Sequence, residues 1–460
     1  MGDVVSPGMY DFSLALLKAV AREGLFQSPT STPDPSPTPT PNSSPVSSPN
    51  PSRSPSPSTP TATAQLQASQ PIALSSSKKR KQQRAKQSSK ANRKRKRTEE
   101  AASQNPDAYE VRAPSHRKHV ESSEPLESHF SFETEARAAS TSYVGLNDGS
   151  GIDRRTPALE ELVGPNSKYK MELYTWDGRT PVPITTPQGR VFGLLAGQPA
   201  DDSTWASVAE AAANTLEAER KNCSFAKKQK KGRRGCFPAL NAGIWHGGGR
   251  IRPGNLVHNE ANTAVLERLA NDWSFKRLVG FAHGVFASWA PRLFAYYQLH
   301  LQSLLENDPT ITRFFQRSVW SAAAFNFGPR TICYPHVDFS NLPFGWCAIW
   351  ALGKFDPKKG GHLILWELNL VIEFPPGSLV LIPSGVCRHS NAAIGRKETR
   401  YSFTQFSPGG IFRWVDHGFQ TEEAYLASQS SQEALKEEQH KQERWQMGLN
   451  LLSTLQELVL

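Results

Sequence analysis

Two residues that can bind a metal ion occur in the short string PHVDFSN, residues 335–341. His336 and Asp338 are separated by one residue, so on an extended segment their side chains lie on the same side of the backbone. They supply two thirds of a 2-His-1-carboxylate facial triad, which holds iron and leaves three coordination positions open. Because the chain has twelve histidines, on the order of one such spacing is expected by chance. The motif therefore needs support from elsewhere in the sequence.

That support comes from residues further along the chain. The apolar run SLVLIPS, residues 378–384, leads within a few residues to His389, which can supply a third ligand from an adjacent strand end. Arg400 follows eleven residues later and begins a strand that contains Ser402. A guanidinium there can bind a carboxylate through two hydrogen bonds, and the serine hydroxyl can add a third. Iron alone needs no such arginine, so the pattern predicts a dicarboxylate cosubstrate.

Other residues could take these roles. His362 is a rival third ligand, but it begins a strand that would have to face inward, and no arginine follows it at a suitable distance. His389 could also be an ordinary polar loop residue.

Three basic residues near Arg400 are alternative cosubstrate anchors. Arg396 and Lys397 fall in the turn GRKE, where side chains are expected to point to solvent, and Arg388 is directed away from the metal because it adjoins His389. We therefore expect His336, Asp338 and His389 to bind the metal and Arg400 to anchor the cosubstrate with Ser402.

The elements that must position these residues have the period of strands. Between residues 319 and 415, short apolar runs are separated by turn signals, which predicts an all-β barrel or jelly roll. Helices are expected before it, at about 203–221, 260–273 and 274–305, the last interrupted by Pro291. The predicted fold class is α+β, with a double-stranded β-helix (jelly-roll) core and supporting helices.

Composition divides the chain unevenly. Residues 27–60 consist almost wholly of Pro, Ser, Thr and Asn, and a polar bias with few aromatic residues continues to about residue 135. Such a segment cannot bury enough apolar surface to offset the entropy of ordering it. We expect a short amphipathic helix in residues 1–26, disorder in 27–135, the catalytic domain in 136–420 and a charged amphipathic helical tail in 421–460.

The net charge of +11 resides mostly in one tract. Residues 78–97 contain twelve Lys or Arg and no acid, so the rest of the chain is close to neutral. Two basic clusters joined by a polar spacer are typical of a bipartite nuclear-import signal, or of an arm that binds nucleic acid non-specifically. We expect recognition by the nuclear import machinery and location in the nucleus. A merely solvated run of charge is the remaining alternative.

Several classes of protein are not favoured. The five cysteines are odd in number and form no CxxC pair, which argues against a secreted disulfide scaffold and a zinc ribbon. No run of eighteen apolar residues occurs, so no membrane span is expected.

A second basic cluster precedes a glycine-rich loop. Residues 227–234 contain six Lys or Arg, and residues 243–254 read GIWHGGGRIRPG. Three consecutive glycines exclude regular structure there and indicate close approach to a ligand or another strand. No GK[ST] follows, so the loop is not a P-loop. We expect the cluster and the loop to contact phosphates.

The joint motif set resembles a known family. His336, Asp338 and Asn341, then His389, then Arg400 and Ser402 are similar to the metal and cosubstrate residues of the TET/JBP branch of double-stranded β-helix dioxygenases. Longer strings such as NFGPRTICYPHVDFSNLPFG resemble fungal TET/JBP-like proteins associated with transposable elements, and the similarity extends back to about residue 230.

The resemblance implies Fe(II), 2-oxoglutarate and O2, and oxidation of 5-methylcytosine in DNA. It also implies that Asn341 contacts the target base, whereas the residue by itself could equally cap the loop after the metal strand. The chain lacks cysteines at the spacing of zinc ligands, which animal TET enzymes have, so the resemblance does not imply how the protein binds a DNA duplex. Two alternatives stay open: an oxygenase of the same fold acting on protein or a small molecule, and a non-catalytic interaction protein.

Overall fold

The computed structural model of the chain describes residues 88–89, 92, 119–147, 155–200 and 202–459. Residues 88–89 and 92 are helical and exposed, and they belong to a unit of their own, Ser13–Gln104. The helix expected in residues 1–26 lies outside the described residues, as does nearly all of the tract 78–97. The following paragraphs concern residues 119–459.

The strands form two sheets. The larger has the order β1 (Leu126–Glu127), β3 (Val182–Thr185), β4 (Val191–Gly197), β11 (Leu379–Ile382), β8 (Cys347–Lys354), β13 (Thr399–Phe406), β7 (Ala322–Asn326), β5 (Ala239–Trp245) and β6 (Gly254–Asn255). The smaller has the order β12 (His389–Asn391), β9 (Leu363–Leu365), β10 (Leu370–Ile372) and β2 (Glu172–Tyr174). Helices lie between groups of consecutive strands, and the longest group in the described part of the chain, β7 to β13, contains no helix, so the predicted α+β class is confirmed.

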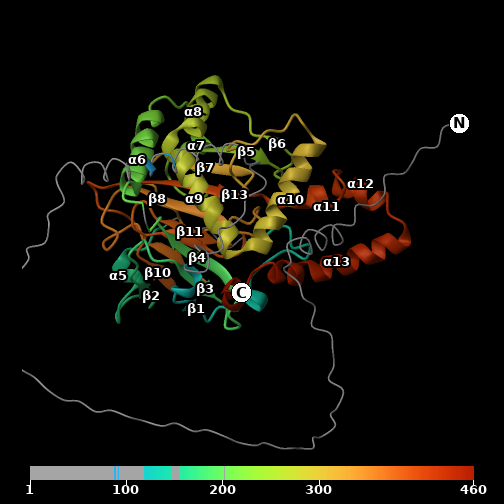
Figure 1. Cartoon of the computed structure of the whole chain (residues 1–460), viewed down its shortest axis with the longest axis horizontal. Coiled ribbons are helices and arrows are strands. Elements are labelled where there is room, and N and C mark those ends of the chain that lie inside the picture. Colours follow the sequence, from blue (N-terminus) through green and yellow to red (C-terminus); the bar gives the residue numbers. More distant parts are fainter. Residues whose placement is uncertain (1–87, 90–91, 93–118, 148–154, 201, 460) are drawn as a thin grey trace, which may run out of the picture. The chain divides into compact units, whose positions relative to one another are not determined.

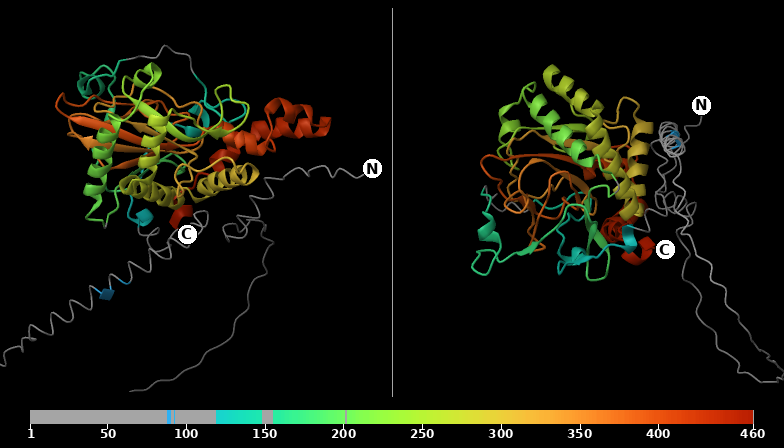
Figure 2. Two further views of the ribbon diagram at one scale, coloured as in Figure 1. Left: turned by 90° about the horizontal axis from the view of Figure 1, so that it is seen from above. Right: turned by 60° about the vertical axis from the view of Figure 1, so that its left-hand side comes forward.

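The longer helices lie along one side of the larger sheet (Figures 1 and 2). They are α6 (Trp205–Arg220), α8 (Glu260–Asn271), α9 (Trp273–Trp289) and α10 (Pro291–Asn307), and the shorter ones are α4 (Phe132–Glu135), α5 (Leu159–Leu162), α7 (Lys227–Lys230) and α11 (Gly409–Asp416). The tail contains α12 (Glu422–Ala427), α13 (Ser431–Asn450) and α14 (Leu455–Val459). Within the described ranges, none of these helices combines the length and hydropathy needed to cross a membrane.

The helices expected between residues 203 and 305 are present. Pro291 separates α9 from α10 and is the first residue of α10, where its missing N–H costs no hydrogen bond. The carboxylate of Asp272 caps α9 by accepting the backbone N–H of Ser274 at 2.9 Å. The break at Pro291 divides one run of apolar periodicity in the sequence into two helices, α9 and α10.

The two faces of β13 have different neighbours. Phe403 makes an edge-to-face contact with Phe275 of α9, with ring centroids 5.1 Å apart, and the hydroxyl of Tyr401 donates to Glu217 of α6. Successive side chains of a strand point to opposite faces. Arg400 and Ser402 therefore project away from the helices.

One extended segment connects the two sheets. The backbone N–H of Arg400 donates to the carbonyl of Pro329 at 2.7 Å, and the N–H of Thr331 donates back to the carbonyl of Arg400 at 2.9 Å. A few residues later, His336 pairs with His389 of the smaller sheet. The segment from Pro329 to His336 thus runs from the start of β13 to β12, and it connects Arg400 with the two histidines through backbone pairing.

The chain on both sides of the predicted domain takes part in the same packing. Residues just before the expected boundary at 136 are already folded, since Leu126 pairs with Ile184 and Phe132 is fully buried. At the other end, the Trp445 ring of α13 lies 5.5 Å from that of Phe132, and its indole N–H donates to the carbonyl of Glu133. The C-terminal half of α13 therefore packs on its own domain.

The glycine-rich loop is shorter than predicted. Residues 243–245 are the end of β5, where Gly243 pairs with β7 and the next two residues pair with β6. The expectation of irregular structure from residue 243 onward was therefore wrong, because sheet pairing overrides the local preference of glycine. Close approach to another strand does occur at Gly243, where an added Cβ would lie 2.4 Å from the carbonyl oxygen of Ser321. Gly247, Gly248 and Gly249 have positive φ values and face open space.

Candidate metal centre

His336, Asp338 and His389 converge. Each offers one ligand atom, and these atoms all lie within 4.8 Å of one another. The two histidines form a bridge between their backbones, which places their imidazole rings side by side with centroids 4.3 Å apart. Both histidines are buried, whereas the Asp338 side chain is 17% exposed. The group is therefore a recessed site that is open on the side of the carboxylate.

Backbone carbonyls fix the orientation of both imidazoles. Nδ1 of His336 donates to the carbonyl of Tyr334 at 2.7 Å, and Nδ1 of His389 donates to the carbonyl of Cys387 at 3.0 Å. In the neutral ring this leaves the Nε2 lone pair free to bind a metal. The two Nε2 atoms lie 3.7 and 3.8 Å from the Asp338 carboxylate oxygens. These donors fit a divalent metal of the iron type.

The electrostatics favour the protonation states that metal ligands need. Burial lowers the pKa of His336 to about 3, with a further contribution from the neighbouring His389, whose own pKa is also lowered by burial. Burial raises the pKa of Asp338, but electrostatic interactions with neighbouring groups, His336 and Arg234 first among them, outweigh it and leave that pKa lowered. Near neutral pH the site offers two neutral imidazoles and one carboxylate.

The loop after Asp338 is held from three sides. The N–H of Asp338 donates to the carbonyl of Ser384 at 2.8 Å. Within the loop, the N–H of Asn341 donates to the carbonyl of Asp338 at 2.8 Å. The N–H of Gly145, far away in the sequence, donates to the carbonyl of Phe339 at 2.8 Å. The side-chain amide of Asn341 donates to the Ser384 hydroxyl at 3.0 Å, so Asn341 links this loop to the end of β11.

Arg400 is buried without an acidic partner among the described residues. It is 3% exposed, Nη1 donates to the carbonyl of Thr331 at 3.1 Å, and Nε has no hydrogen-bond partner. Burial lowers the pKa of Arg400 to about 10, so the guanidinium stays charged near neutral pH. A buried charge is costly unless an opposite charge accompanies it. The site therefore favours an anion, and a ligand carboxylate would satisfy it.

Two further polar residues near Arg400, Asn326 and Thr331, were missed by sequence analysis. The side-chain amide of Asn326 donates to the Ser402 hydroxyl at 2.7 Å, while its Oδ1 and the hydroxyl of Thr331 are buried without a partner. Asn326 pairs with Ser402 across β7 and β13, so both side chains are on the face that carries Arg400. The available signal was a single amide in the apolar run AAAFNF, which alone does not indicate a site.

The alternative residues lie elsewhere. His362 is adjacent to Ala392, whose side chain packs with Ile364 in a separate apolar cluster, and both ring nitrogens of His362 lack a partner. His362 is fully buried, and it is not part of the candidate metal-binding group. Arg388 points toward Glu367, with 3.9 Å between Nε and Oε1.

The remaining anchor candidates, Arg396 and Lys397, are exposed. They lie in the turn that precedes β13, so neither takes the buried position of Arg400.

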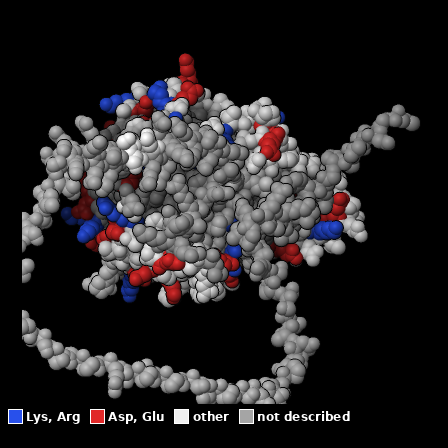
Figure 3. Space-filling view, viewed as in Figure 1, with Lys and Arg blue, Asp and Glu red and all other residues white. Residues whose placement is uncertain are grey.

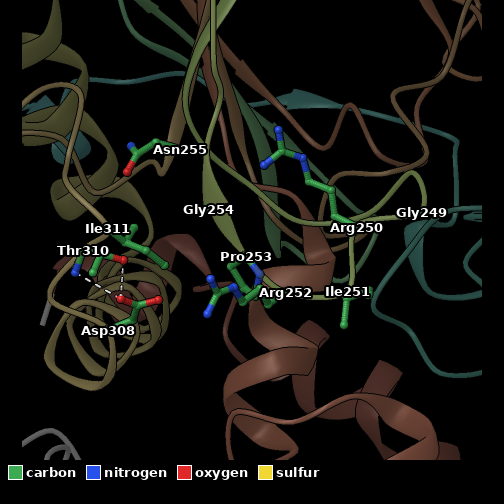
Figure 4. Close-up of a pocket in the computed structure, with 10 residues that line it drawn as sticks. All are labelled: Gly249, Arg250, Ile251, Arg252, Pro253, Gly254, Asn255, Asp308, Thr310 and Ile311. Atoms are coloured by element: carbon green, nitrogen blue, oxygen red, sulfur yellow. Dashed lines mark hydrogen bonds between the residues drawn. The ribbon is translucent and has the colours of Figure 1, made fainter.

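The glycine loop borders a separate hollow (Figure 4). It is an open depression of about 490 Å³ whose walls are residues 249–255 of the loop with Asp308, Thr310 and Ile311. In Figure 4, Asp308 is hydrogen-bonded to Thr310, and Arg250 and Arg252 extend from the loop. None of the three candidate metal ligands lines it.

Comparisons with known proteins give a limited result. No family model matches the chain, and no curated protein matches it. Among solved structures, it is similar to NgTET1 in complex with 5mC DNA, with a TM-score of 0.38 and 14% identity, over 52% of this chain and 83% of that chain. A similarity at this level assigns neither a family nor an activity.

Proposed function

We propose that the chain is an Fe(II)- and 2-oxoglutarate-dependent dioxygenase of the TET/JBP type with a jelly-roll core. The observation that carries this proposal is the combination of two sites that are connected by the segment from Pro329 to His336. One is the group of His336, Asp338 and His389, and the other is a buried guanidinium, Arg400, that has no acidic partner among the described residues. A structural metal site would need only the first of these.

The residues have distinct roles in this proposal. His336, Asp338 and His389 would hold the iron from one side, so that other coordination positions stay available. Arg400 and Ser402 would bind the distal carboxylate of 2-oxoglutarate, with Asn326 orienting the serine hydroxyl. With both cosubstrates bound, the expected chemistry is oxidation of a C–H bond by O2, with 2-oxoglutarate converted to succinate and CO2. Burial of these polar groups would exclude water from the reacting atoms.

The substrate that we propose is 5-methylcytosine in DNA. Its support is the match of the motif set, Asn341 included, to the TET/JBP pattern, together with the basic tracts at residues 78–97 and 227–234. A base within a duplex would have to leave the stack to reach a recessed site. Nuclear import through residues 78–97 belongs to the same proposal, because a DNA substrate requires access to the nucleus.

A direct assay tests the proposal. The full chain is incubated with Fe(II), 2-oxoglutarate and methylated DNA, and oxidised bases and succinate are measured by mass spectrometry. We expect both products from the wild type and neither from His336→Ala, whereas His362→Ala should retain both. Succinate without base oxidation would identify an oxygenase with another substrate, and the absence of both products would indicate a non-catalytic protein.

A further inference from the structure

A short hairpin brings the second basic cluster to the metal centre. After α7, Gly232 pairs with Gly235, and Gly235 pairs in turn with Cys333, three residues before His336. The N–H of Tyr334 donates to the carbonyl of Arg234 at 2.8 Å. An added Cβ at Gly235 would lie 2.5 Å from the carbonyl oxygen of Ile332, so the two backbones are in close contact. The hairpin is therefore fixed to the segment that carries the metal ligands.

This hairpin places Arg233 beside three consecutive residues of the metal loop. Its Nη1 donates to the carbonyl of Val337 at 3.1 Å, its Nη2 lies 4.0 Å from Oδ1 of Asp338, and its Cζ lies 5.4 Å from the centre of the Phe339 ring. The side chain is 38% exposed. A guanidinium thus lies at the open side of the metal centre, partly in contact with solvent.

The hydrogen-bonding capacity of Arg233 is largely unused. Its contact with Asp338 is at the outer limit of an ion pair, and the carbonyl of Val337 accepts its hydrogen bond. Arg268 provides a comparison, because it forms a two-bond pair with Glu219 at 2.7 and 2.6 Å. A guanidinium has five N–H donors, so Arg233 keeps donors for which the described residues supply no acceptor.

The surrounding charge selects the kind of ligand. Six Lys or Arg and no acid occur between residues 227 and 234, and α7, which carries three of them, has no buried residue. In the coloured parts of the face seen in Figure 3, Lys and Arg side chains are mixed with those of Asp and Glu. A one-signed basic cluster next to the metal centre therefore favours an anionic substrate with more than one charge along its length.

We infer that Arg233 binds a phosphodiester of the nucleic-acid substrate, next to the nucleotide whose base enters the metal centre. This inference rests on the proposed function for its substrate class. The planar guanidinium fork matches two oxygens of a phosphate. Since the hairpin is fixed to the segment of the metal ligands, a phosphate held by Arg233 fixes the target nucleotide relative to the metal. Arg233 is thus a substrate-positioning residue.

The test uses oligonucleotides in which one phosphate is neutral. A set of duplexes with one 5-methylcytosine carries a single methylphosphonate at successive linkages around that base, and Kd is measured without O2. For the wild type we expect one linkage at which Kd rises on the order of tenfold, the size of a charge-assisted hydrogen bond. Arg233→Gln should bind the unmodified duplex more weakly by a similar factor, with no further loss at that linkage. Arg233→Lys should lie between them.

A matched control removes a charge elsewhere. Arg396→Gln also deletes one exposed arginine, at the turn before β13, and should give the wild-type methylphosphonate profile. The slope of log Kd against log salt should fall by about one for Arg233→Gln. Fe(II) affinity is measured in parallel, because an effect through Asp338 would change it.

The outcomes separate this inference from the proposed function. If the wild type binds and oxidises DNA but Arg233→Gln keeps the wild-type profile, the inference alone is overturned. If Arg233→Gln loses Fe(II) binding, Arg233 supports Asp338 instead of the substrate, and the inference is again overturned. If the wild type neither binds nor oxidises nucleic acid, the proposed substrate class fails and the inference fails with it.

Discussion

The backbones of His336 and His389 are hydrogen-bonded to each other in both directions, at 3.0 and 2.9 Å. This pair joins the segment from β7 to the short strand β12 and makes the positions of the two imidazoles dependent on each other. The ring of each histidine is further held by a carbonyl two residues earlier, that of Tyr334 or Cys387. Two imidazoles held in this way are preorganised for a metal ion.

Removal of one imidazole should abolish metal binding without unfolding the protein. His389→Ala should lower the affinity for Fe(II), or for Co(II) as a spectroscopic probe, by more than the roughly 10- to 100-fold typical of losing an outer-shell partner, because a direct ligand is lost. The measurement is a metal titration with a thermal melt of the metal-free protein as a check on folding. His362→Ala, the matched control, should titrate like the wild type; loss of metal binding in that variant would contradict the assignment.

Replacement of Arg400 should separate cosubstrate binding from stability. Arg400→Met should weaken 2-oxoglutarate binding on the order of 10- to 100-fold, since a charge-assisted pair contributes about 1.5–3 kcal/mol. Without ligand the variant should be no less stable than the wild type, because the deleted charge is buried without an acidic partner among the described residues. Thermal melts with and without 2-oxoglutarate measure both effects, and a large loss of stability without ligand would indicate a purely structural guanidinium.

Asn326 and Ser402 should act as one unit. Asn326→Ala removes the donor that orients the Ser402 hydroxyl and should weaken 2-oxoglutarate binding by about 1 kcal/mol. The double variant Asn326→Ala/Ser402→Ala should lose less than the sum of the single variants, because both break the same interaction. Calorimetric Kd values for the four proteins complete the cycle, and strict additivity would argue against coupling.

Acid should destabilise the protein through His362. Burial lowers the pKa of His362 from 6.5 to about 4 in the folded state. Between these values the unfolded chain binds a proton that the folded protein does not, so the free energy of unfolding falls as the pH drops from about 6.5 to about 4. The full contribution is on the order of 3 kcal/mol. Denaturant unfolding across this range should show a shallower fall for His362→Leu than for the wild type.

The control for that experiment is His440→Gln, which alters an exposed histidine on α13. Its stability should follow the wild-type pH dependence. Equal slopes for His362→Leu and the wild type would mean that His362 is accessible to protons in the folded state.

The hydrogen bond from Gly145 to Phe339 of the metal loop should be weakened by a single added methyl group. In Gly145→Ala, the new Cβ would lie 1.9 Å from the carbonyl oxygen of Gly385, so backbone must move and the bond from residue 145 to Phe339 should weaken. We expect a lower melting temperature and weaker metal binding. Gly280→Ala, at an exposed and open position inside α9, should instead stabilise by about 0.5–1 kcal/mol.

Local sequence patterns determined the fold class and which neighbouring side chains point the same way. The alternation of His336 and Asp338 and that of Arg400 and Ser402 are set by spacing along extended chain, so they could be read without a structure. The strand period between 319 and 415 and the helical period before it likewise gave the α+β class. Side-chain direction within one strand or helix depends on the backbone of that element alone.

Only the tertiary structure determined which residues from distant segments of the chain are in contact, because these contacts depend on strand pairing. Asn326 joins Ser402 because β7 pairs with β13, and Arg233 reaches Asp338 because Gly235 pairs with Cys333. Strand register is fixed by the packing of the whole sheet, and sequence separation carries no information about it. For the same reason the basic cluster was visible in the sequence as charge, while its place at the metal centre was not.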